Sequence, residues 1–130
     1  MTDVDFPEEL QLFIETCLPT VDAMELLLLL SRHRERLWRP ENLMNELQPD
    51  TVIKLSALRE YLTFFKERGL ITETREGRYQ LGPLSEETET VVKMLTTAYN
   101  TRPVTLIRMV YSLADRKISL FADAFKFKKE

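Results

Sequence analysis

The stretch from residue 51 to residue 81 constrains the fold more than any other part of the chain. Its apolar residues recur at the three-and-four spacing of one buried helical face: Leu55, Leu58, Leu62 and Phe65. Gly69 follows, and glycine commonly ends helices because it adopts the left-handed conformation without steric cost. The pattern therefore predicts a long helix that ends near Arg68.

Two β-prone segments, residues 70–74 and 78–81, follow this glycine. Both alternate between apolar and polar side chains, and residues 75–77 (Arg, Glu, Gly) between them have the composition of a tight turn. The sequence thus predicts a β-hairpin directly after the long helix.

Helical patterns dominate the rest of the chain. Apolar residues lie along one face of residues 6–18, with Pro7 placed to occupy the first turn, whereas residues 21–34 are apolar nearly all round and predict a central core helix. A basic cluster at the end of that helix, expected to be a solvated helix end, comprises Arg32, His33, Arg34 and Arg36.

The remaining elements are predicted from shorter signals. Leu37 and Trp38 form a short strand, Pro40 begins a short helix that ends near Leu47, and residues 48–50 form a turn. Three further helices are expected toward the C-terminus: one capped by Ser85 and reaching Tyr99, one from Val104 to Tyr111, and one that begins at Asp115. The predicted fold class is therefore mainly α with a small β-hairpin.

Three segments carry a family resemblance: LWRPENLMNEL, then LxxxLxxFxxxGLI, then ExREGRYQL. With them, residues 20–82 resemble the winged helix-turn-helix of bacterial transcription regulators. The resemblance implies a winged-helix core at 20–82 between an N-terminal helical arm at 1–19 and a C-terminal helical extension at 83–130, all in one domain. The spacing from Leu47 to Leu62 is about one turn longer than in the family, so either the inter-helix turn is extended or the second helix starts early.

Length and charge limit the classes of function. A chain of 130 residues can bury one compact core, and its longest apolar run, residues 26–30, is far below the roughly 20 residues that span a bilayer. Residues 1–5 are acidic where a secretory signal would be basic, so we expect a cytoplasmic protein without a membrane role.

The net charge of −3 is unevenly distributed. Residues 1–31 hold seven acidic side chains and no Lys or Arg, so the rest of the chain is net positive by four. Nucleic-acid binding depends on such local basic surface and not on the sum over the chain.

Residues for catalysis or metal binding are scarce. Cys17 is the only cysteine and His33 the only histidine, and three glycines form no phosphate-binding loop. Neither a nucleophile with a base nor a pair of carboxylates at catalytic spacing is present. We therefore expect no enzyme activity, no metal and no cofactor.

The first functional hypothesis, which the resemblance implies, is a DNA-binding transcription regulator. Winged-helix DNA binders place the outward face of the second helix in the major groove and use cations of the wing on the DNA backbone. The candidate contacts to double-stranded DNA are Lys54, Ser56, Arg59, Arg75 and Arg78.

The helical phase complicates this hypothesis. Turning 100° per residue away from the buried face places mostly apolar and acidic side chains outward: Ile53, Ser56, Ala57, Glu60, Phe64 and Glu67. Glu60 and Glu67 would repel phosphate.

The second hypothesis is a winged-helix module that binds protein instead of DNA. Its candidate contacts are apolar residues of two helices: Ile53, Tyr61, Phe64, Val91, Leu95 and Tyr99. The apolar stripe of residues 88–99 predicts a homodimer, since two-fold pairing is the commonest way to bury such a stripe. The alternative is that the C-terminal arm of the same chain covers these residues. A basic band from Arg59 to the hairpin would favour DNA, and an apolar or acidic patch would favour protein.

Overall fold

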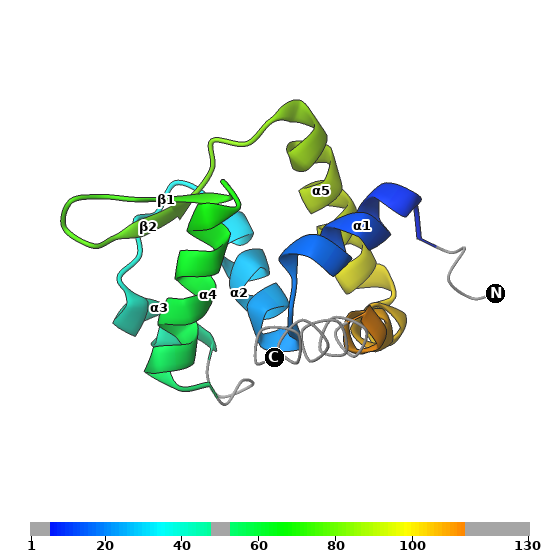
Figure 1. The fold of residues 1–130 in the computed structure, drawn as a ribbon, viewed down its shortest axis with the longest axis horizontal. Coiled ribbons are helices and arrows are strands. Elements are labelled where there is room, and N and C mark those ends of the chain that lie inside the picture. Colours follow the sequence, from blue (N-terminus) through cyan, green and yellow to red (C-terminus); the bar gives the residue numbers. More distant parts are fainter. Residues whose placement is uncertain (1–5, 48–52, 114–130) are drawn as a thin grey trace, which may run out of the picture. The chain divides into compact units, whose positions relative to one another are not determined.

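The structure is a computed structural model that describes residues 6–47 and 53–113. This part of the chain is mainly helical, with one small antiparallel sheet (Figure 1), as predicted. The elements are α1 (Glu8–Cys17), α2 (Val21–Arg32), α3 (Pro40–Leu47), α4 (Leu55–Glu67), β1 (Ile71–Glu73), β2 (Tyr79–Leu81) and α5 (Glu86–Thr101), followed by a helix over residues 103–113.

The described residues group into two compact units. One comprises residues 6–21 and 93–113, and the other comprises residues 22–92. The predicted core at 20–82 falls almost entirely in the second unit, although the predicted domain boundaries themselves stay a prediction. No helix in the described ranges is long and apolar enough to cross a bilayer.

Helix α4 has the phase and the end that its sequence predicts. Leu58, Leu62 and Phe65 are each 0% exposed. At the C-terminus of α4, Gly69 has a φ of +77°. The N–H of Gly69 donates to the carbonyl oxygen of Lys66 at 3.0 Å, and the N–H of Leu70 donates to the carbonyl oxygen of Phe65 at 2.9 Å. These two bonds form a Schellman motif, which satisfies carbonyls that the helix end would leave without partners.

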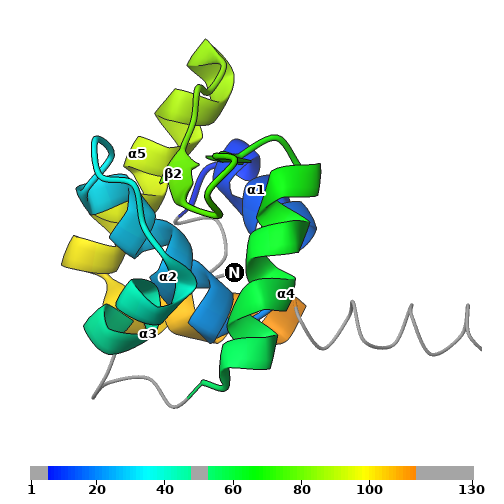
Figure 2. The same ribbon diagram turned by 90° about the vertical axis from the view of Figure 1, so that its left-hand side faces the viewer.

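Helices α3 and α4 pack against each other, and the C-terminal end of α4 leads into β1 (Figures 1 and 2). Since α3 ends at Leu47 and α4 begins at Leu55, the longer spacing falls in the connection between the helices, not in an early start of α4. The predicted turn at residues 48–50 lies outside the described residues.

The sheet contains the predicted hairpin and one further backbone pairing. Strands β1 and β2 are antiparallel, with Ile71 opposite Leu81 and Glu73 opposite Tyr79. Trp38 bridges to Tyr79 through two backbone hydrogen bonds of 2.8 and 2.7 Å. The strand predicted at Leu37 and Trp38 is therefore present as a single bridge, which ties the segment after α2 to the hairpin.

The basic cluster after α2 is not simply a solvated helix end. The Arg34 guanidinium donates to both carboxylate oxygens of Glu89 in α5, at 2.6 and 2.8 Å, and Arg36 lies over the Trp38 ring at 3.8 Å. The side chains of Arg34 and Glu89 remain 40% and 32% exposed. Because solvent screens such a pair, we expect it to add little to stability and mainly to orient the two side chains. His33 also meets the Trp38 ring edge-to-face, with the ring centroids 5.8 Å apart, so three of the four basic residues have structural partners, which corrects the expectation from sequence.

Other helix predictions hold in part. All of Leu26 to Leu30 in α2 are buried, which confirms the core helix. Ser85 caps α5 as predicted, because the N–H of Thr88 donates to the Ser85 Oγ at 3.2 Å. Pro7 is the N-cap of α1 and not a residue of its first turn.

The unit of residues 6–21 and 93–113 contains α1, the end of α5 and the last described helix. Leu10 and Ile14 are buried in α1, and Leu106 and Val110 are buried in residues 103–113. On the same helix Val104 and Tyr111 are exposed, at 62% and 61%. The helix predicted from Asp115 lies outside the described residues.

Candidate interaction surface on helix α4

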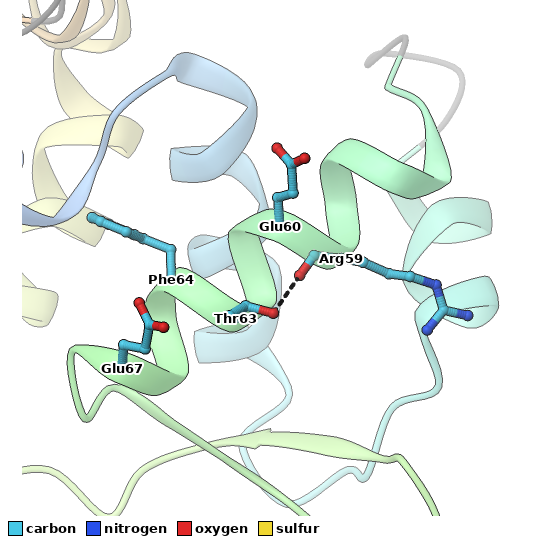
Figure 3. A pocket seen from close by; sticks show the side chains of 5 residues that line it. All are labelled: Arg59, Glu60, Thr63, Phe64 and Glu67. Atoms are coloured by element: carbon cyan, nitrogen blue, oxygen red, sulfur yellow. Dashed lines mark hydrogen bonds between the residues drawn. The ribbon is translucent and has the colours of Figure 1, made fainter. Parts of the chain in front are cut away.

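A shallow depression of about 380 Å³ lies on the outward side of α4. We call its lining residues the α4 face (Figure 3): Arg59, Glu60, Thr63, Phe64 and Glu67. The spacing of three and four residues places them on one side of the helix, opposite the buried Leu58, Leu62 and Phe65. Glu60 and Glu67 are exposed and Phe64 is half-buried, as the helical phase predicts.

The prediction for Ile53 is wrong. Ile53 was expected on the outward side of the helix, but it is only 8% exposed. The physical reason is that α4 begins at Leu55, so the helical phase cannot be extended back to residue 53. Ala57 and Tyr61 are half-buried, whereas Ser56 is exposed.

Arg59, a predicted DNA contact, pairs with an acid of the neighbouring helix. Its Nη2 lies 3.5 Å from Oε2 of Glu41 in α3, and its side chain points away from Phe64 and Glu67 (Figure 3). Both side chains are more than half exposed, so the pair adds little to stability. It nevertheless places a negative charge beside the cation that was expected to contact phosphate.

Lys66, a second cation flanking α4, is bound to the hairpin. Its Nζ donates to Oε1 of Glu73 in β1 at 2.7 Å. This hydrogen bond is the main cause of a lowered pKa of Glu73 and a raised pKa of Lys66. Desolvation, followed by the interaction with Glu73, raises the pKa of Tyr79 in β2. The three residues form a polar link from α4 to both strands.

A third cation covers the aromatic ring of the α4 face. The Arg68 guanidinium lies 4.8 Å from the centroid of the Phe64 ring. Such a contact is an attraction between the cation and the negative face of the ring. It keeps Arg68 beside the apolar part of the surface.

The predicted contacts at the helix start and on the hairpin differ in accessibility. Lys54 is exposed at the N-cap position of α4, and Arg75 is exposed in the hairpin turn. Arg78 is half-buried, and within the described part of the chain its Nε is buried without a hydrogen-bond partner. Lys54 and Arg75 thus offer accessible charge, while Arg78 is partly withdrawn.

The apolar candidates on α5 are mostly not on the surface. Leu95 is 0% exposed, which excludes it from any surface contact and corrects its assignment. Val91 and Tyr99 are half-buried. Of the predicted protein contacts, Phe64 is the one that lines the depression.

Sequence reasoning missed the acids that neutralise the flanking cations. Glu41 reaches Arg59 from another helix, and Glu73 reaches Lys66 from a strand. Neither pair has a helical i, i+4 spacing, so no local pattern points to it. Within residues 6–47 and 53–113, no group of His, Cys, Asp and Glu could hold a metal ion.

We expect replacement of Lys66 with Met to raise the pKa of Glu73 toward its ordinary value, because the main cause of its depression is removed. Since the folded pKa of Glu73 is lowered, its contribution to stability is present above the unfolded pKa and is lost as the pH falls through the folded pKa. A carboxyl-carbon NMR titration measures the change. Lys54→Met, at the opposite end of α4, should leave the titration of Glu73 unchanged; an equal shift in both variants would contradict the pairing.

Comparison of the chain with protein-family models, with curated proteins and with solved structures found no match.

Proposed function

We propose that the protein is a winged-helix module whose second helix binds protein instead of reading DNA. The order of elements in residues 22–92 supports the winged-helix part of the proposal. A core helix, the bridge at Trp38, two packed helices and a hairpin follow one another, and the bridge adds a third backbone segment to the hairpin. This is the element order of a winged helix-turn-helix, with α4 as the second helix and the hairpin as the wing.

The charge of the α4 face carries the choice of protein over DNA. A DNA-reading helix presents donors and cations to base edges and phosphates. The α4 face presents the carboxylates of Glu60 and Glu67 on either side of Phe64 (Figure 3). Of the cations on and beside this face, Arg59 pairs with Glu41, Lys66 pairs with Glu73, and Arg68 lies over the Phe64 ring. An acidic and apolar surface of this kind repels a phosphate backbone and suits a protein partner.

A DNA-binding regulator is the second candidate function. One observation favours it: Lys54 and Arg75 are exposed at the start of α4 and in the turn of the hairpin, where winged-helix proteins contact the DNA backbone. Such contacts would supply affinity without sequence readout, since phosphates carry no sequence information.

We expect the purified chain to show no saturable binding to random-sequence duplex DNA, even at low salt, where the electrostatic attraction is largest. Fluorescence anisotropy at low and moderate salt measures this. Binding that Arg59→Ala and Arg75→Ala each weaken, with a salt slope lower by about 0.9 per lost phosphate contact, would reject the proposal in favour of the regulator. Arg108→Ala in the other unit is the matched loss of one charge and should have no such effect.

A further inference from the structure

We infer that the outer side of the hairpin sheet binds an acidic segment of a partner protein. This inference rests on the proposed protein-binding function and names the chemistry of the partner. We call the surface the hairpin face, and it consists of residues from the bridged segment at Trp38 and from both strands: Leu37, Arg39, Thr72, Thr74, Arg78 and Gln80.

The opposite side of the same sheet faces the core. Three apolar residues on that side are at most 5% exposed: Trp38, Ile71 and Leu81. Neighbouring residues along extended backbone point their side chains to the other side of a sheet. Leu37, Arg39 and Thr72 are such neighbours, and all three are exposed. The described part of the chain therefore leaves the hairpin face open.

The backbone pairing places two arginines opposite each other on this face. Trp38 and Tyr79 exchange both backbone hydrogen bonds, so the next residues of the antiparallel pair are Arg39 and Arg78. Arg39 precedes Pro40, and a residue before proline is held in extended conformation. Like charges directly opposite in a sheet are destabilising, and folds keep such locally unfavourable pairs mainly at functional sites. The pair thus points to an anionic ligand.

No acid of the described residues neutralises the two arginines. The ion pairs within residues 6–47 and 53–113 use three other cations: Arg34, Arg59 and Lys66. The exposed acids nearest in sequence, Glu35 and Glu76, are not among the partners of these pairs. Glu76 follows Arg75 in the hairpin turn, so these two charges offset each other. Arg39 and Arg78 therefore give the hairpin face its positive charge.

The chemistry of the face favours carboxylates of a protein over phosphates. A guanidinium binds a carboxylate through two parallel hydrogen bonds, and two neighbouring guanidinium groups suit a segment with several acids. Arg78 is half-buried and loses less side-chain freedom on binding than a fully exposed arginine would. Leu37, 40% exposed beside the arginines, offers apolar contact to a peptide side chain but nothing to a phosphate.

The test uses a short fluorescein-labelled peptide in which glutamate alternates with serine, and the same peptide with glutamine in place of glutamate. Fluorescence anisotropy with the full-length chain at low salt should show saturable binding of the glutamate peptide and none of the glutamine peptide. Arg39→Gln together with Arg78→Gln should weaken binding about tenfold, the combined effect of two exposed ion pairs.

A matched control separates this loss from a change in net charge. Lys93→Gln with Arg108→Gln removes two exposed cations outside residues 22–92 and should leave peptide binding unchanged. Far-UV circular dichroism should show that both double variants fold. Arg39→Gln alone, at an exposed position, should still weaken binding if the replacement of the half-buried Arg78 affects folding.

A third variant distinguishes a binding role of the arginines from a structural one. Arg39→Glu places a carboxylate opposite Arg78, and opposite charges across a sheet stabilise it. This variant should therefore raise the urea midpoint of unfolding and abolish binding of the glutamate peptide. A structural role would lower the midpoint instead.

Three outcomes would overturn the inference. Equal binding of both peptides would show that carboxylates are not recognised, equal weakening in the control variant would remove the hairpin face from the contact, and a lower urea midpoint for Arg39→Glu would mean that the arginines are not opposite each other. Each leaves the proposed role of the α4 face standing. Saturable duplex binding would instead reject the proposed function, whatever the peptides do, so the two failures can be distinguished.

Discussion

Replacing Trp38 with Ala is expected to lower the free energy of unfolding by about 3 to 5 kcal/mol, the range for removing a fully buried large aromatic side chain. Trp38 is 0% exposed and is among the largest fully buried side chains of the described chain. Its backbone pairs with Tyr79 and its ring packs under the Arg36 guanidinium. The cavity would therefore open where the segment after α2 joins the hairpin.

Urea unfolding followed by circular dichroism measures this loss, since Trp38 is the only tryptophan and its removal abolishes tryptophan fluorescence. Leu37→Ala is the control, because the neighbouring Leu37 is 40% exposed. The loss for Leu37→Ala should be several times smaller. Similar losses at both positions would mean that Trp38 does not occupy the core.

The second large effect is expected at Leu62 in α4. Leu62→Ala should cost about 2 to 5 kcal/mol, because the lost methyl and methylene groups leave a cavity in the core. Leu58→Ala should fall in the same range, since both residues are 0% exposed. Glu60→Ala, on the exposed side of the same helix, should change stability by about 0.5 kcal/mol or less.

The same urea experiment compares these variants. Glu60 and Leu62 are two residues apart, so they lie on nearly opposite sides of a helix. Equal losses at the two positions would mean that the helical phase of α4 is wrong. The assignment of Glu60, Phe64 and Glu67 to the α4 face would then fail as well.

Local patterns in the sequence predicted most of the elements. The buried side of α4, its end at Gly69, the hairpin turn at Gly77 and the cap at Ser85 each depend on residues within one or two turns of the chain. Such short-range preferences arise from backbone sterics and from hydrogen bonds between near neighbours. They act before any tertiary contact forms, which is why one sequence suffices to identify them.

Local patterns predict burial poorly next to the end of a helix, because they do not give the residue at which the helix begins. Ile53 has the spacing of the outward side of α4, but the helix begins two residues later and Ile53 is buried. Leu95 likewise belongs to an apolar stripe whose burial the sequence could not assign to one chain or to two. Periodicity predicts which residues share a side of a helix, but it does not indicate what covers that side.

The sequence by itself thus determined the mainly helical fold, the hairpin and the acidic and apolar character of the α4 face. The tertiary structure decided how the cations beside that face are used. Arg59 meets Glu41 across two helices, Lys66 meets Glu73 across a helix and a strand, and Arg34 meets Glu89 over 55 residues of sequence. The physical reason is that a charge affects its surroundings through distance in space, and elements separated in sequence come within ion-pair distance only when the chain is folded.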